Sequence, residues 1–283
     1  MNSSQRLLVV NADDLGFAPG VNRGILEAHR AGTLTSASMM VNTPAFAEAV
    51  DLVRGDAPRL GVGLHLNLVS GRPLADVPSL VDPATGTFHA LDVLARRALS
   101  GLVELADVRR ECDAQLGALT AAGIEPTHVD SHRHAHAMPG ILPAVAAAAR
   151  DSGVHFVRRP LDQPSLLDPI AGAKILVLHA AWRAALHGVA PAHRALLARA
   201  PHFRGIAMQG APDVRERLLA TVDALPRGAT EIMLHPGYDD AVLADQDPYR
   251  REREADVGAL VHPAVVARLQ CEDVRLVHFG EIS

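Results

Sequence analysis

The sequence predicts an α/β fold, a distorted (β/α) barrel of TIM-barrel type with parallel strands. Strand-like apolar runs alternate with helix-like segments along all 283 residues. The first run, residues 7–10, is apolar without interruption, as in strands that are covered on both faces. Several runs end on Asp, His or Arg, and the carboxyl ends of parallel strands face the active site in such barrels. We expect one domain spanning residues 1–283.

Each element is predicted from its pattern of apolar residues and from Gly or Pro at its ends. Strands are expected over residues 7–13, 35–41, 60–68, 127–131, 155–159, 203–208, 231–234 and 274–279. Helical spacing indicates helices over residues 21–31, 45–53, 104–122, 141–150, 214–224, 249–260 and 263–270. Residues 71–88, rich in Pro, Asp and Gly, indicate a surface loop. The Ala-rich segment 170–200 is helical in pattern, with an interruption around Gly188 and Pro191, and its role stays open.

Composition narrows the function classes. A net charge of −5 gives no reason to expect nucleic acid or an anionic membrane as a partner. Cys112 and Cys271 alone cannot build a disulfide framework or a Cys-based metal site. No stretch approaches the ~18 consecutive apolar residues of a membrane span. We expect a cytoplasmic protein without a membrane span, and a homodimer is left open.

Two adjacent carboxylates, Asp13 and Asp14, end the first expected strand. Close like charges raise one pKa or require a cation, so a purely structural role is unfavourable. The alternative is that Asp13 caps the following turn while Asp14 is solvated. In a regular strand, neighbouring side chains diverge, so these two carboxylates are expected to play different roles.

The fourth expected strand is the richest in polar side chains. If its backbone stays extended, five alternate positions point the same way: His128, Asp130, His132, His134 and His136. Imidazole and carboxylate groups are ordinary ligands for a divalent metal, while an exposed polar strand edge is the other interpretation. His65, near the end of the third strand, fits either a ligand or a hydrogen-bonded core residue.

Two further strand ends carry polar residues. Pro236 restricts His235 to an extended conformation at the end of strand 231–234. Arg158 and Arg159 end the fifth strand, either as a solvated pair or in an orienting role. Five expected strands thus carry Asp, His or Arg at the same end, and this arrangement indicates an active site.

The motifs at residues 11–16, 63–65 and 127–136, together with the His235-Pro236 strand end, resemble the YdjC-like carbohydrate deacetylases. That family includes chitooligosaccharide deacetylases and relatives associated with hopanoid biosynthesis. The resemblance extends from residue 7 to about residue 240. It implies a distorted (β/α) barrel and metal-dependent removal of an N-acetyl group from a sugar.

The resemblance also assigns residues to roles. It implies that Asp14, His65 and His132 are metal ligands, with Asp13 as base and His235 as general acid. We expect one divalent ion, zinc, magnesium or another, and mixed His and Asp ligation favours a transition metal. We add Arg158 to the catalytic residues in an orienting role and leave the roles of His128, His134, His136 and Arg159 open. Arg133 stands where chitooligosaccharide members can have His, which leaves the substrate open.

Elementary chemistry is consistent with that reaction. An amide is a poor electrophile, and a metal both polarises its carbonyl and lowers the pKa of a bound water from ~15.7 towards ~7. Three protein ligands leave a position open for water, and a protonated His can supply the proton that the amine needs. Two alternatives remain: a metal-dependent phosphoesterase on a similar barrel, and a non-catalytic sugar-binding protein. With only 3% aromatic residues, few side chains can stack on a sugar, and the sole Trp, Trp182, fits either the site or the core.

Overall fold

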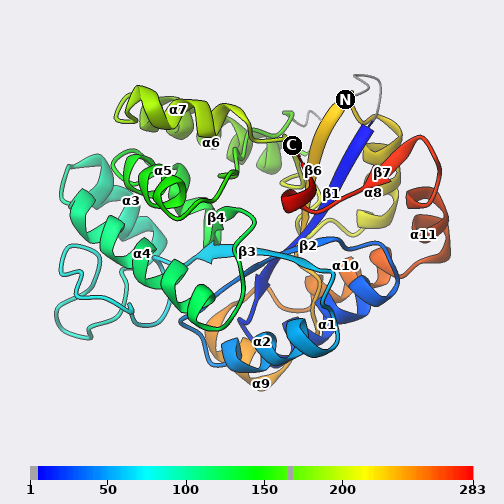
Figure 1. Cartoon of the computed structure of the whole chain (residues 1–283), viewed down its shortest axis with the longest axis horizontal. Coiled ribbons are helices and arrows are strands. Elements are labelled where there is room, and N and C mark those ends of the chain that lie inside the picture. Colours follow the sequence, from blue (N-terminus) through cyan, green and yellow to red (C-terminus); the bar gives the residue numbers. More distant parts are fainter. Residues whose placement is uncertain (1–5, 165–167, 283) are drawn as a thin grey trace.

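A computed structural model describes residues 6–164 and 168–282 of the chain. A curled parallel sheet lies at its centre and helices cover it, so the predicted α/β distorted barrel is confirmed (Figure 1). The strands are β1 (Arg6–Leu15), β2 (Ser36–Met39), β3 (Gly61–Leu66), β4 (Val129–Ser131), β5 (His202–Arg204), β6 (Gly228–Leu234) and β7 (Val274–Leu276).

The helices are α1 (Pro19–Arg30), α2 (Phe46–Gly55), α3 (Leu91–Leu99), α4 (Leu105–Ala121), α5 (Leu142–Asp151), α6 (Pro169–Leu186), α7 (Pro191–Ala198), α8 (Val214–Asp223), α9 (Ala241–Gln246), α10 (Glu252–Leu260) and α11 (Pro263–Leu269), with short 3-10 turns η1 (His132–Ala137) and η2 (Phe279–Glu281). The seven expected helices are present, together with α3 and α9, which the sequence did not predict. The Ala-rich segment forms α6 and α7, broken where Gly188 and Pro191 predicted. In the described part of the chain, no helix has the length and apolar character needed to cross a membrane.

The sheet has the order β4-β3-β2-β1-β6-β5, and β7 pairs with the first residues of β1. Every pairing is parallel, so the strands predicted around Asp13, His65, Asp130 and His235 end at one edge, as expected. The expected strand at 155–159 is wrong as a full strand. Among the described residues, the segment makes one parallel bridge, between Val157 and Val129 of β4, in which the Val129 N–H donates to the Phe156 carbonyl and the Arg158 N–H to the Val129 carbonyl.

The two faces of β1 explain where the polar residues gather. Leu8, Val10 and Ala12 pack into the main hydrophobic core. On the other face, Val9 packs in a small cluster with Phe156, Val277 and Phe279, and the same face continues as Asn11 and Asp13. One face of the strand therefore changes from apolar to polar towards its carboxyl end.

Candidate active site

A polar cavity of about 190 Å³ opens at the carboxyl edge of the sheet. Five of the six predicted site residues line it, and Arg158 is buried in contact with one of them, Asp13. Its lining comprises Asp13, Asp14, His65, Leu91, His132, Arg133, His134, Lys174, Gln209, His235, Asp247, Tyr249 and Arg253.

A β-bulge presents the adjacent carboxylates to this cavity. Between β1 and β2, the step from Ala12 to Leu15 faces the shorter step from Ala37 to Met39, so β1 has one extra residue. Asp14 takes the left-handed conformation, with φ 71°. That conformation costs about 1–2 kcal/mol for a residue with a Cβ. The bulge replaces the regular strand in which the Asp13 and Asp14 side chains were expected to diverge.

The Asp14 carboxylate stands at the centre of the candidate metal site. Its Oδ1 lies 3.1 Å from His65 Nε2 and 2.8 Å from His132 Nδ1. One ligand atom from each of these three buried residues lies within 4.8 Å of the other two. Two imidazole nitrogens and one carboxylate oxygen form a donor set that suits a divalent cation. Behind it, Asp130 Oδ1 lies 2.7 Å from His65 Nδ1, a partner that fixes a ligand imidazole in orientation.

The protonation of His65 supports the fit of a cation. Burial lowers its pKa, but the charges of Asp130 and Asp13 raise it, and the net pKa is about 10. Without a metal, these carboxylates therefore hold a proton on the imidazole. A metal bound at Nε2 would take the place of that proton and satisfy the same negative charge.

Arg158 fixes the other carboxylate of the pair. Its Nη1 and Nη2 donate to Asp13 Oδ2 and Oδ1 at 2.7 and 2.6 Å, and its Nε donates to Glu231 Oε1 at 2.8 Å. Asp130 Oδ2 lies 2.7 Å from Nη2. Arg158 is 1% exposed, so a solvated arginine pair is wrong for this residue.

The network around Arg158 gives its carboxyl groups different pKa values. Burial raises the pKa of Asp13, but the charge and hydrogen bonds of Arg158 outweigh burial and hold that pKa well below its ordinary value. For Glu231, burial prevails over Arg158 and raises the pKa to about 7. Asp13 is therefore ionised at neutral pH, in one fixed orientation.

Arg253 is a site residue that the sequence did not reveal. From α10, its Nη2 donates to Asp14 Oδ2 at 2.7 Å and lies 3.4 Å from Asp247 Oδ2. The buried Nη1 has no hydrogen-bond partner among the described residues. The residue sits in a run of charged residues on a helix and not at a strand end, so no pattern marked it. Lys174, Gln209 and Asp247 also line the cavity and were missed: Lys174 lies on α6, Gln209 in the turn after β5 and Asp247 at the end of α9.

His235 follows directly after β6, as the Pro at 236 predicted. Its Nε2 lies 3.9 Å from Asp13 Oδ2, and its ring makes an edge contact with Tyr249 at 5.6 Å between centroids. Burial lowers the pKa of His235, the charges of Asp13 and Asp14 oppose that, and the net pKa is about 4. The imidazole is therefore neutral at neutral pH.

Asp256 holds the backbone of His235 in place and makes stability depend on pH. Its Oδ2 accepts the His235 N–H at 2.8 Å, and burial raises its pKa from 3.8 to about 7. A carboxyl whose pKa is raised by folding adds stability at pH below ~4 that is lost as pH rises towards ~7. Between about pH 5 and pH 8, the free energy of unfolding should fall by about 1–3 kcal/mol more for the wild type than for Asp256→Asn. Urea unfolding of both proteins tests this, and equal pH dependence would contradict it.

The expected alternation after Asp130 is wrong. β4 ends at Ser131, and Arg133 and His134 take left-handed conformations with φ 54° and 55°. The five side chains therefore do not share one direction, although His132 does reach Asp14.

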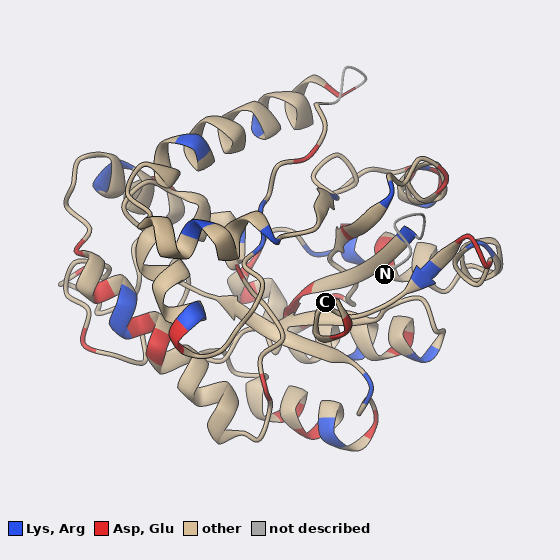
Figure 2. Cartoon of the chain, turned by 45° about the horizontal axis from the view of Figure 1, so that its top comes forward, with Lys and Arg blue, Asp and Glu red and all other residues tan. Residues whose placement is uncertain are grey.

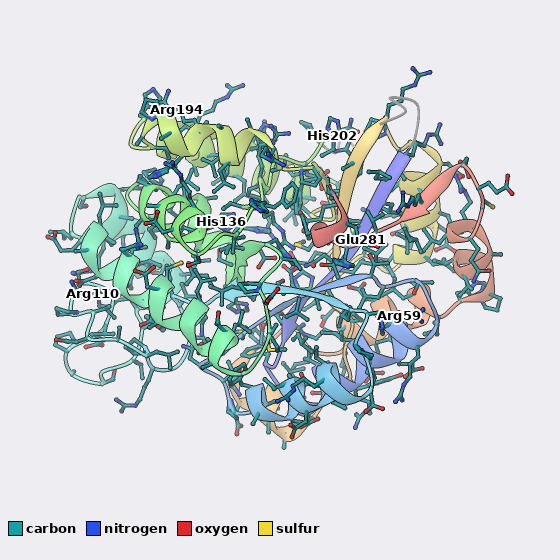
Figure 3. All side chains as sticks on the ribbon, viewed as in Figure 1. Arg59, Arg110, His136, Arg194, His202 and Glu281 are labelled. Atoms are coloured by element: carbon teal, nitrogen blue, oxygen red, sulfur yellow. The ribbon has the colours of Figure 1, made fainter. Side chains whose placement is uncertain are left out.

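The remaining histidines of this run have separate surroundings. His128 stacks on Phe279, with 4.0 Å between ring centroids. His136 lies inside the molecule near β4 and α5 (Figure 3), with its ring nitrogens 2.6 Å from Ser131 Oγ and 2.9 Å from the Arg158 carbonyl oxygen. His134 lines the cavity and contacts Phe203 edge-on. Trp182 is 2% exposed and packs in the core.

Comparison with known proteins places the chain in a family. A family model described as "YdjC-like protein" matches residues 7–271. The chain is 36% identical to a carbohydrate deacetylase of Geobacillus stearothermophilus over 98% of both chains. It is 40% identical to a chitooligosaccharide deacetylase of Yersinia pestis over 53% of this chain and 58% of that one.

Solved structures agree with the fold. A protein of Enterococcus faecalis V583, described as a candidate for cellobiose-phosphate cleavage, matches with a TM-score of 0.76 and 28% identity over 98% of both chains. The Bc1960 peptidoglycan N-acetylglucosamine deacetylase shares the fold, with a TM-score of 0.50 and 11% identity, over 100% of this chain and 90% of that one. By its sequence, this chain therefore belongs to the YdjC-like family, among relatives named carbohydrate deacetylases.

Proposed function

We propose that this protein is a metal-dependent hydrolase that removes the N-acetyl group from an acetylated amino sugar. The observation that carries the proposal is the buried convergence of Asp14, His65 and His132 beside Asp13 and His235 in one cavity. The names of the relatives, carbohydrate deacetylase and chitooligosaccharide deacetylase, support a carbohydrate substrate such as a chito-oligosaccharide.

Asp14, His65 and His132 would hold one divalent ion, zinc or magnesium, and the two imidazoles favour a transition metal. When bound, such an ion supplies Lewis acidity to an acetyl carbonyl and to water. Arg253 holds the second oxygen of Asp14, which leaves Oδ1 facing the two imidazoles. The carboxylate is thereby set to offer one oxygen to a cation.

Asp13 is the base in this proposal, and Arg158 is its positioning residue. The two hydrogen bonds from Arg158 aim the carboxylate and keep it ionised. The same ion pair lowers the pKa of Asp13, so this carboxylate accepts a proton only from a water that has been made acidic. Asp13 can therefore act as a base only when a metal bound at the neighbouring site lowers the pKa of the water.

His235 is the general acid. In the reaction, the oxygen of water bonds to the acetyl carbon, the C–N bond breaks, and the nitrogen leaves with a proton as an amine. Because His235 is neutral at neutral pH, the proton that it donates must come from the reaction itself. Asp13 Oδ2, 3.9 Å from His235 Nε2, is the nearby carboxylate from which that proton can come.

Acetate release tests the proposal. The protein would be stripped with a chelator, reconstituted with zinc or magnesium, and assayed on N-acetylated chito-oligosaccharides and on an aryl phosphate. We expect acetate from the reconstituted protein and none from the stripped protein. Phosphate release without acetate would favour the phosphoesterase, and sugar binding without either product would favour a non-catalytic protein. Arg158 is buried and already forms ion pairs with Asp13, Asp130 and Glu231, so its guanidinium is not free to bind a phosphate.

A further inference from the structure

We infer that the substrate carries an aliphatic group attached to its amino sugar, and that this group lies in a groove between α3, η1 and α6. This inference rests on the proposed function and extends it to the class of substrate. The groove has a volume of about 670 Å³, more than three times that of the polar cavity. Its aliphatic and Pro lining includes Leu91, Leu99, Met138, Val177, Leu178 and Ala181.

The groove and the candidate active site are continuous. Four residues, Leu91, Arg133, His134 and Lys174, line both cavities. A molecule whose acetamido end faces Asp13 would therefore extend past these four residues into the groove. Its other end would meet an apolar surface, not solvent.

The chemistry of the groove suits a hydrocarbon better than a second sugar ring. Sugar subsites offer aromatic faces for stacking and converging polar groups for hydroxyls. Eleven of the fifteen groove-lining residues are aliphatic or Pro, and none is Phe, Tyr or Trp. The four polar ones are Asp92, Arg133, His134 and Lys174, and three of these are the residues shared with the active site. A chito-oligosaccharide would find few protein partners there for its hydroxyl groups.

The rim of the groove is apolar although it faces solvent. Leu99 on α3 is 74% exposed and Val177 on α6 is 68% exposed. Along all of α6, Lys174 and Arg183 are the only charged residues, so this helix, at the top of Figure 2, is mostly tan. A bound aliphatic group would remove these exposed side chains from water.

The methyl and octyl glycosides of N-acetylglucosamine test the inference. Both are assayed below the concentration at which the octyl compound forms micelles. Each methylene that enters an apolar site should raise kcat/KM about fourfold. We expect kcat/KM to be at least about tenfold higher for the octyl than for the methyl glycoside. In the double variant Leu99→Gln/Val177→Gln, we expect this octyl-to-methyl ratio to fall at least about fivefold.

The matched control is the double variant Ile170→Gln/Leu176→Gln. It removes two exposed apolar side chains of α6, 84% and 60% exposed, that do not line the groove. Its octyl-to-methyl ratio of kcat/KM should equal that of the wild type. Equal kcat/KM for both glycosides in the wild type, or an equal ratio in both double variants, would overturn the inference while leaving the proposed function intact. No acetate from either glycoside would instead overturn the proposed function.

Other occupants of the groove give distinct results. If a second copy of the chain covers it, the wild type should be a dimer in sedimentation, the groove variant a monomer, and the ratio should stay near one. If the groove rests on a lipid surface, the wild type should co-sediment with vesicles, again with a ratio near one. Either result would overturn the inference.

Discussion

Replacing Asp13 with Asn is expected to lower turnover about 10²–10⁴-fold, because the amide cannot accept a proton from water. That loss corresponds to roughly 3–5 kcal/mol of barrier. The variant should stay folded and keep its metal, since Arg158 retains Asp130 and Glu231 as partners and Asp13 is not one of the proposed ligands. Acetate release, circular dichroism and metal analysis on the same preparation measure all three quantities.

Glu231→Gln is the matched control for Asp13→Asn. It also removes one carboxylate from Arg158, but Glu231 does not line the cavity. We expect turnover to fall less than about tenfold, which separates proton acceptance from the loss of an ion-pair partner. Equal losses in the two variants would show that Asp13 matters only as a partner of Arg158.

Removing an imidazole from the metal site should have an equally large effect. His65→Ala and His132→Ala each delete one of three proposed ligands, so we expect metal affinity to fall at least about 100-fold and activity to fall with it. Wild-type protein should bind about one divalent ion per chain. Metal content after dialysis, followed by acetate release over a range of added metal, gives both numbers.

His134→Ala is the control for these two variants. His134 lines the same cavity but is not one of the two histidines that converge on Asp14, so this variant should retain its ion. Full occupancy in the His65→Ala/His132→Ala double variant would exclude the site and point to His134 and His136. The structure argues against that pair, because both ring nitrogens of His136 already have partners.

The sequence was sufficient to predict the sheet and the end of it that carries the polar residues. Apolar runs and the residues after them placed Asp13, His65 and His235 at strand ends, and parallel pairing brings these ends to one edge. His235 was predictable in detail because Pro236 restricts its backbone. These features depend on local patterns that one strand shows on its own.

What the sequence did not reveal depends on departures from regular geometry or on distant partners. The bulge at Asp14 and the left-handed pair Arg133 and His134 change the direction of side chains that period-two alternation treats as fixed. Arg253 contacts Asp14 across 239 residues of sequence, and its helix, α10, has the run of charged residues that is typical of a surface helix. No local pattern could have connected them.

The position of the bound ion tests the central claim most directly. Crystals of zinc-reconstituted protein, measured at the zinc absorption edge, would locate it by anomalous scattering. We expect one peak about 2.0–2.2 Å from an Asp14 carboxylate oxygen, His65 Nε2 and a His132 ring nitrogen. In Asp14→Asn crystals the peak should weaken and return with excess zinc, whereas Asp13→Asn should leave it in place. A peak that Asp13→Asn abolishes and Asp14→Asn retains would reverse the two roles, and a peak at His134 and His136 would contradict the site.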